Sequence, residues 1–149
     1  MASRKTTIRL DQVNPAMTVF RSRYWARRMV YVLRADKSQK YENGRSRIVY
    51  IGETRKGTRR PAASAASKSL MAFAKLRGVR RIEVYPITFR GKRHVRLWEV
   101  LERDMLSVFK RMFGGVPCYN RQGHGKKFVV DKIRFFSPKR LQNVIKALS

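Results

Sequence analysis

Residues 28–53 read RMVYVLRADKSQKYENGRSRIVYIGE, which is two apolar runs separated by a polar segment. The runs MVYVL and IVYI are rich in β-branched and aromatic residues, a composition typical of strands. The polar segment 36–45 contains Asn43-Gly44, a turn dipeptide. This arrangement predicts an antiparallel hairpin with a long polar loop, its strands at 28–35 and 47–53.

Further elements follow the hairpin. Their patterns predict an extended segment at 128–136, a third strand at 81–89, and helices at 62–76, 94–113 and 139–148. Pro61 and Gly78 bound the first helix, because proline is tolerated in a first turn and glycine ends helices. Pro86 requires an edge or a bulge, and Ser137-Pro138 starts the last helix. The order predicts an α+β fold, with a small, mostly antiparallel three-stranded sheet flanked by helices.

The chain is strongly basic. Its 149 residues include 36 Lys and Arg against 9 Asp and Glu, a formal net charge of +27. Self-repulsion at this charge opposes folding unless a polyanion binds, and Lys and Arg gain affinity for nucleic acid by releasing counterions from phosphates. DNA or RNA is therefore the expected partner, with an acidic membrane surface as the weaker alternative. A hydrophobic content of 43% is enough for a core, so the chain is not a disordered basic tail.

Composition also disfavours several classes of protein. Cys118 is the single cysteine and forms no internal disulfide, so we expect a reducing, cytoplasmic compartment. No apolar run approaches ~20 residues, and no apolar stretch follows the first residues, so we expect neither a membrane span nor a secretory signal. Two histidines and one cysteine argue against structural zinc. We expect one domain at 28–125, a basic arm at 1–27, and a basic β-α extension at 126–149 packed on the domain.

One glutamate of the long predicted helix lies beside an apolar stripe. Glu102 has Trp98 at i−4 and Met105 at i+3. A lone carboxylate is costly there, so it needs a cation, either an arginine or a bound divalent metal. The charge of Glu99 is explained more simply, because Glu99 can form an ion pair with Arg103 at i+4.

Two tyrosines and two arginines are further candidates for functional residues. Tyr31 and Tyr50 lie mid-strand, and alternation with period 2 puts Tyr50 on the face of Ile48. The two tyrosines are either ordinary sheet aromatics or functional groups. Arg59 and Arg60 lie at the start of the first helix, where positive charge opposes the helix dipole. They indicate either a solvated helix start or a phosphate site.

These residues resemble the motifs of the GIY-YIG nuclease domain, in the family's order, over residues 28–125. Met29-Val30-Tyr31 stands for the first motif, with methionine in place of glycine, and Tyr50-Ile51-Gly52 is the second motif intact. The later positions of the family are an arginine, a helical glutamate and an asparagine after a proline. They correspond to Arg60, to Glu102 in Leu101-Glu102, and to Asn120 in Pro117-Cys118-Tyr119-Asn120. Ser64 departs from the many members that have His or Tyr one turn after the arginine.

The resemblance implies an endonuclease that needs Mg²⁺ or Mn²⁺ and hydrolyses DNA phosphodiester bonds to leave a 5′-phosphate. Tyr31 would be the general base or would orient the attacking water, and Tyr50 would assist it. A phenol is a weak base unless cations stabilise the phenolate, which Arg60 could do while also stabilising the phosphate. Glu102 would hold the metal. Asn120 would brace the site by hydrogen bonds.

Basic residues around this domain are expected to bind DNA, with RNA less favoured. They are Arg21, Arg23, Arg55, Lys56, Arg59, Lys126 and Lys127. The small size favours a compact enzyme that is restriction-like or recognises DNA structure. A double-strand cut by one site per chain favours a homodimer, whereas a monomer would nick each strand in turn. The alternative is a non-catalytic, basic DNA- or RNA-binding protein on a nuclease-like scaffold, which the net charge fits equally well.

Overall fold

The computed structural model describes residues 28–55, 59–89, 97–120 and 136–149. In these ranges the chain forms three helices and a three-stranded sheet, in the order β1 (Met29–Tyr41), β2 (Gly44–Thr54), α1 (Arg59–Lys75), β3 (Ile82–Ile87), α2 (Leu97–Phe113) and α3 (Pro138–Leu148). The strand order is β2-β1-β3, and both strand pairs are antiparallel. The predicted α+β class and antiparallel sheet are confirmed. The predicted arm at 1–27 lies outside the described residues, as does the predicted extended segment up to residue 135.

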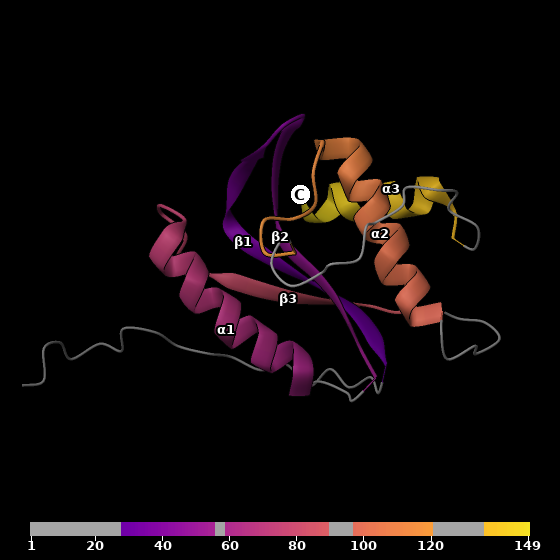
Figure 1. The fold of residues 1–149 in the computed structure, drawn as a ribbon, viewed down its shortest axis with the longest axis horizontal. Coiled ribbons are helices and arrows are strands. Elements are labelled where there is room, and N and C mark those ends of the chain that lie inside the picture. The colour runs from indigo at the N-terminus through magenta and orange to yellow at the C-terminus, as the bar shows by residue number, and fades with distance from the viewer. Residues whose placement is uncertain (1–27, 56–58, 90–96, 121–135) are drawn as a thin grey trace, which may run out of the picture.

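β1 is the central strand, and helices cover both faces of the sheet. Figure 1 shows α1 on one side of the sheet and α2 with α3 on the other. The first five residues of β1 are all buried, each at most 2% exposed. A strand that is buried on both faces needs a continuous apolar run rather than an alternating one. The run MVYVL is therefore the signature of this central position.

Two apolar clusters hold the layers together. The larger cluster joins the sheet to α2 and α3 and includes Val30, Val32, Ile48, Ile51, Leu101, Met105, Phe109 and Ile145. The smaller cluster joins the sheet to α1 and includes Tyr31, Leu33, Val49, Ala72, Val79 and Tyr119. Successive residues of β1 thus enter opposite clusters, as the period of a strand requires.

The hairpin lacks the long polar loop that was predicted at 36–45. Both strands continue through this segment and meet at the turn Glu42-Asn43. Polar contacts across the hairpin support it, because the Arg45 guanidinium donates to the Ser38 hydroxyl at 3.0 Å and to the Ser38 carbonyl at 2.9 Å. Tyr41 fixes the hairpin to α2 by packing edge-on against a phenylalanine ring, with a centroid distance of 5.1 Å. The prediction was wrong because tertiary packing, not apolar alternation, holds these strands.

A bulge at Val49 decides which β2 side chains face α1. The register changes from Leu33↔Tyr50 to Arg34↔Ile48, so Val49 is the extra residue. Ile48 lies in the cluster under α2, whereas Tyr50 packs against the cluster under α1. The expectation that Tyr50 shares a face with Ile48 is wrong, because period-2 alternation is interrupted at a bulge.

Element boundaries follow the sequence signals with small shifts. α1 already begins at Arg59, before the proline. Pro86 lies in β3, which is an edge strand of the sheet, as predicted. The last helix follows Ser137-Pro138 as predicted, although the serine side chain forms no cap hydrogen bond.

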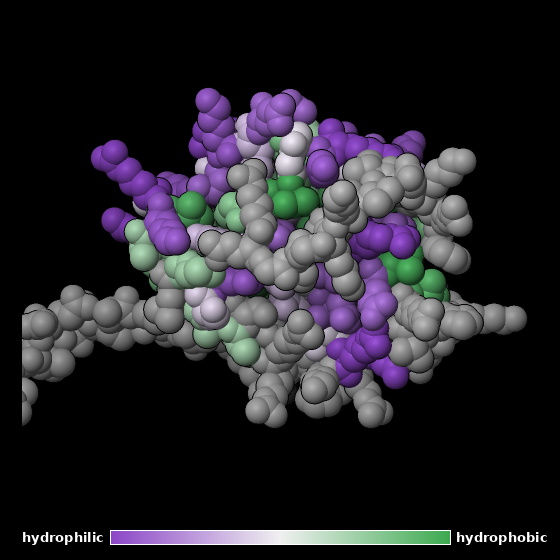
Figure 2. Space-filling model, viewed as in Figure 1, coloured by the Kyte–Doolittle hydropathy of each residue, from purple (hydrophilic) through white to green (hydrophobic). Residues whose placement is uncertain are grey.

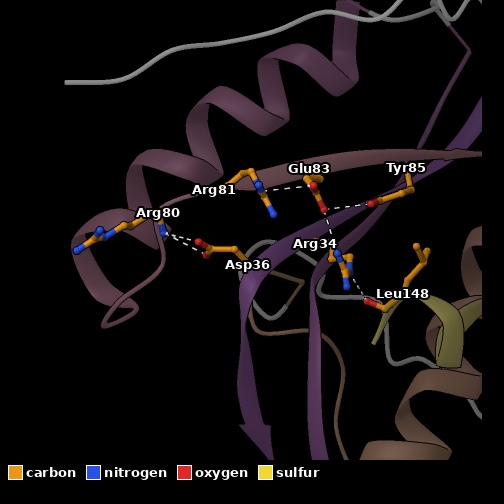
Figure 3. A network of polar contacts seen from close by, with 7 residues as sticks. All are labelled: Arg34, Asp36, Arg80, Arg81, Glu83, Tyr85 and Leu148. Atoms are coloured by element: carbon orange, nitrogen blue, oxygen red, sulfur yellow. Dashed lines mark hydrogen bonds and ion pairs between the residues drawn. The ribbon is translucent and has the colours of Figure 1, made fainter. Parts of the chain in front are cut away.

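Polar contacts fasten the end of α3 to the sheet (Figure 3). Arg34 on β1 donates to the Leu148 carbonyl and to Glu83 on β3, each at 3.0 Å. Glu83 also accepts a hydrogen bond from Tyr85 at 3.0 Å and pairs with Arg81 at 3.4 Å. A cation is favourable at a helix C-terminus, where carbonyls lack partners within the helix. The C-terminal helix is therefore an integral part of the domain.

Candidate active site

The two motif tyrosines lie together on the face of the sheet that α1 covers. The register pairs Tyr31 with Gly52 and Leu33 with Tyr50, which makes the tyrosines diagonal neighbours on adjacent strands. Their ring centroids are 5.9 Å apart, and the ring planes are inclined by 44°. Tyr31 is fully buried, and Tyr50 is half-buried.

Gly52 is the residue over which the two rings meet. A Cβ atom at this position would lie 2.6 Å from Cε1 of Tyr50. It would also lie 2.9 Å from both Cζ and Oη of Tyr31. These distances are shorter than real Cβ contacts, so a side chain at this position would displace one or both rings. The glycine of Tyr-Ile-Gly is therefore required by space.

Asn120 fixes the residue between Tyr50 and Gly52. Its Oδ1 accepts from the Ile51 backbone N–H at 2.9 Å, and its Nδ2 donates to the Ile51 carbonyl at 2.7 Å. The side chain is 2% exposed. It thus satisfies both backbone groups of a residue on the outer edge of β2, where no further strand is paired in the described sheet. The predicted bracing role of Asn120 is consistent with these two bonds.

The segment that carries Asn120 runs along the outer edge of β2. The Tyr119 N–H donates to the Val49 carbonyl at 2.9 Å, and the Cys118 N–H donates to the Tyr41 hydroxyl at 3.2 Å. A loop that pairs with an edge strand protects it from pairing with another chain. The same contacts bring residues 118–120 against the α1 side of the sheet.

Tyr119 contributes a third phenol, which the sequence interpretation missed. Its side chain is buried in the same cluster as Tyr31, and its hydroxyl has no hydrogen-bond partner among the described residues. Burial raises the pKa of the Tyr119 phenol above its ordinary value, and the charge of the Cys118 thiolate adds to this effect. No sequence signal beyond the neighbouring motif asparagine marked Tyr119.

Among the described side chains, Lys68 on α1 is a cation next to the tyrosine pair, and the sequence interpretation missed it too. Its Nζ atom lies 4.5 Å from the centroid of the Tyr50 ring. Positions 60, 64 and 68 are spaced by four residues, so they follow one stripe of the helix. That spacing was the sequence signal that could have identified Lys68.

The arginine candidates differ in what surrounds them. Arg59 and Arg60 form the first turn of α1, and only their backbone is described. Arg55 forms ion pairs with Glu99 on α2 and, at 3.8 Å, with Glu53. The predicted Glu99–Arg103 pair is wrong, because the end of β2 brings Arg55 to Glu99 instead.

Other predicted nucleic-acid contacts fall outside the described residues. They are Arg21, Arg23, Lys56, Lys126 and Lys127.

Glu102 lies on α2, which packs on the opposite face of the sheet from the tyrosines. It is partly exposed, between the buried Leu101 and the exposed Arg103. The most buried carboxylate of the helix is instead Asp104, at 2% exposure. Asp104 accepts a bond from Arg103 at 3.3 Å through Oδ1, and its Oδ2 has no hydrogen-bond partner in the described ranges. Burial raises the pKa of the Asp104 carboxyl, and Arg103 opposes this in part.

The described residues thus bring Tyr31, Tyr50 and Asn120 together around β2, with Lys68 beside them. In the same ranges, no group of three or more His, Cys, Asp or Glu residues has an arrangement that could hold a metal ion. None of the helices described has the length and apolar character needed to cross a membrane.

On the face shown in Figure 2, most of the described side chains are hydrophilic. Figure 2 shows them around the rim of the molecule, with hydrophobic side chains in small separate patches. α1 and α3 contain no Asp or Glu, and α3 exposes Lys139, Arg140 and Lys146. Comparisons with protein-family models, with curated proteins and with solved structures find no match for the chain.

Proposed function

We propose that the chain is a DNA endonuclease of the GIY-YIG type. The observation that supports this most strongly is the convergence of Tyr31 and Tyr50 on Gly52. Ile51 lies between Tyr50 and Gly52, and Asn120 holds it through both of its backbone groups. An ordinary pair of sheet aromatics requires neither a glycine beneath the rings nor a buried amide on the strand edge.

In this proposal the tyrosine pair activates the water that attacks the phosphorus atom. The bond from phosphorus to the 3′ oxygen breaks, and the products are a 5′-phosphate and a 3′-hydroxyl. The resemblance assigns the base role to Tyr31, but Tyr31 is fully buried and Tyr50 is half-buried. Exposure therefore favours Tyr50 as the phenol that contacts the water, with Tyr31 behind it. Arg60, in the first turn of α1, would stabilise charge on the phosphate.

The implied cofactor is Mg²⁺ or Mn²⁺, and Glu102 is the residue that would hold it. Mg²⁺ is commonly bound by one or two carboxylates together with waters and substrate phosphates. A single, partly exposed glutamate therefore fits this ion, although no cluster of three ligands is present in the described ranges. When bound, the ion would stabilise negative charge on the leaving oxygen.

The net charge of +27 and two helices without acidic residues favour a nucleic-acid partner, and the resemblance to the nuclease family makes DNA the proposed substrate. Arg55 already has two carboxylate partners, Glu53 and Glu99. Arg60 and the cations of α3 are therefore better candidates for phosphate contacts. Recognition by a homodimer would place one site on each DNA strand.

A non-catalytic DNA- or RNA-binding protein is the second candidate. Two observations favour it: Tyr31 is fully buried, and the helix of Glu102 lies on the other face of the sheet. The two candidates differ in what the tyrosine hydroxyls do.

The test is cleavage of plasmid DNA with Mg²⁺ by the wild type and by Tyr31→Phe and Tyr50→Phe. Loss of a proton-transfer group slows a reaction by about 10²–10⁴-fold. We expect at least one of the variants to lose cleavage to this extent while DNA affinity is retained. Equal cleavage rates in all three proteins would refute a role for the phenols.

A further inference from the structure

Lys68 and the two motif tyrosines form one continuous series of contacts. The Lys68 ammonium is 4.5 Å from the centre of the Tyr50 ring, and that ring is 5.9 Å from the Tyr31 ring. An ammonium group over an aromatic face is attracted by the negative face of the ring. Lys68 thus restrains Tyr50 from the α1 side, while Gly52 leaves room for the ring on the strand.

Lys68 differs from several other cations of the described residues in its ionic contacts. Arg34 and Arg81 pair with Glu83, and Arg55 pairs with Glu53 and Glu99. No acidic side chain within the described ranges forms an ion pair with Lys68, and α1 itself contains no acidic residue. Among the described residues, the contact of its ammonium group is with the Tyr50 ring.

Lys68 is a cation in the immediate surroundings of Tyr50. The titratable groups packed there in the described residues are Tyr31 from β1, Lys68 from α1, and Cys118 and Tyr119 from the segment along β2. The three groups other than Lys68 are neutral or negative when they titrate. A phenolate in this cluster would be stabilised by Lys68.

We propose that Lys68 is a positioning residue for the Tyr50 phenol, which it holds toward Tyr31 and whose phenolate form it stabilises. The proposal rests on the proposed nuclease function. The phenol first loses its proton to solvent. The phenolate then takes a proton from the attacking water as the water oxygen bonds to phosphorus. The bond to the 3′ oxygen breaks, and the leaving oxygen takes a proton from solvent.

The experiment compares three variants with the wild type. Lys68→Met keeps an unbranched side chain that is one atom shorter and removes its charge, and Lys68→Arg restores a cation that also stacks on aromatic rings. Lys75→Met, on the exposed end of the same helix, is the control for loss of one positive charge. Circular dichroism confirms that each variant is folded.

Two readouts are measured as a function of pH: single-turnover cleavage of plasmid DNA with Mg²⁺, and NMR of ¹³C-labelled tyrosine ring carbons in the free protein. We expect Lys68→Met to slow cleavage roughly 10-fold and to move the rise of the rate to higher pH. The Tyr50 signal should titrate at higher pH in the same variant. Lys68→Arg should restore both readouts, and DNA affinity should fall no more than in Lys75→Met.

The outcomes separate this proposal from the nuclease proposal. A Tyr50 titration that is the same in Lys68→Met and the wild type overturns the role of Lys68, whether or not the protein cuts DNA. Cleavage by Lys68→Met that matches Lys75→Met overturns it as well. If the Tyr50 titration differs between Lys68→Met and the wild type, the Lys68–Tyr50 interaction is supported. If the wild type also cuts no DNA, the nuclease function is refuted.

Discussion

Substitution of Gly52 by alanine should destabilise the protein, because the added methyl group meets two aromatic rings. It would lie 2.6 Å from a ring carbon of Tyr50 and 2.9 Å from the ring and hydroxyl of Tyr31. Tyr31 is fully buried, so displacement of its ring disturbs the packing around it. Overpacking of this kind costs about 1–3 kcal/mol. The lower entropy of the unfolded alanine chain offsets about 0.4–1 kcal/mol.

We therefore expect Gly52→Ala to lower the free energy of unfolding by about 1–2 kcal/mol. The melting temperature should fall by about 4–8 °C, at about 4 °C per kcal/mol for a chain of this size. Urea unfolding followed by circular dichroism measures the change. In a Tyr50→Ala background one of the close contacts is absent, so the same substitution should cost less.

Gly78→Ala is the matched control. Gly78 has φ +81°, and no atom lies within 4 Å of the place that an added methyl group would take. The destabilisation by Gly78→Ala therefore comes from backbone strain and should not depend on Tyr50. Unchanged stability of Gly52→Ala, or an equal loss with and without the Tyr50 ring, would refute the convergence of the tyrosines on Gly52.

Three further substitutions test the site and its surroundings. Asn120→Ala should lower the free energy of unfolding by about 2–4 kcal/mol in urea titrations, because it leaves the buried N–H and carbonyl of Ile51 without partners. Tyr119→Phe should leave the midpoint of thermal unfolding unchanged or raise it, because it removes a buried hydroxyl that has no partner in the described ranges. Asp104→Asn should reduce the loss of stability that occurs as pH rises above the ordinary pKa of an aspartate, about 4. The folded-state pKa of Asp104 is raised, so the folded protein binds this proton more tightly and loses stability as pH rises above that value.

Each of these has a contradicting result. An Asn120→Ala variant as stable as the wild type would mean that water replaces the amide without penalty. A Tyr119→Phe variant destabilised by more than about 1 kcal/mol would show that the hydroxyl has a partner. Parallel pH profiles for Asp104→Asn and the wild type would show that Asp104 titrates as an exposed carboxyl does.

The parts of the sheet that the sequence predicts correctly are those held together by apolar packing. The apolar run at 29–33 predicts a strand, and Pro86 predicts an edge or a bulge; the structure has a buried strand at the first position and an edge strand at the second. Residues 36–45 give the opposite result, because their strands are held by polar side-chain bonds and by Tyr41 packing on α2. Composition alone carries no signal for contacts of that kind.

The candidate site is predictable to the extent that it depends on local motifs. Tyr50 and Gly52 belong to one tripeptide, but the bulge at Val49 that sets their orientation has no signature in a single sequence. The Arg55–Glu99 pair joins residues far apart in the chain, so helix spacing pointed to Arg103 instead. Such pairs become visible only when the elements are placed in space.

Cleavage of plasmid and branched duplex DNA tests the central claim most directly, with the wild type, Glu102→Gln and Glu42→Gln each assayed in Mg²⁺ and in EDTA. Glu42 is an exposed carboxylate in the hairpin turn and serves as the control for loss of one negative charge. We expect Mg²⁺-dependent cutting by the wild type and Glu42→Gln, and none by Glu102→Gln, with DNA affinity retained in all three. Tight DNA binding without cutting in Mg²⁺ or Mn²⁺ would contradict the nuclease function and favour a basic binding protein.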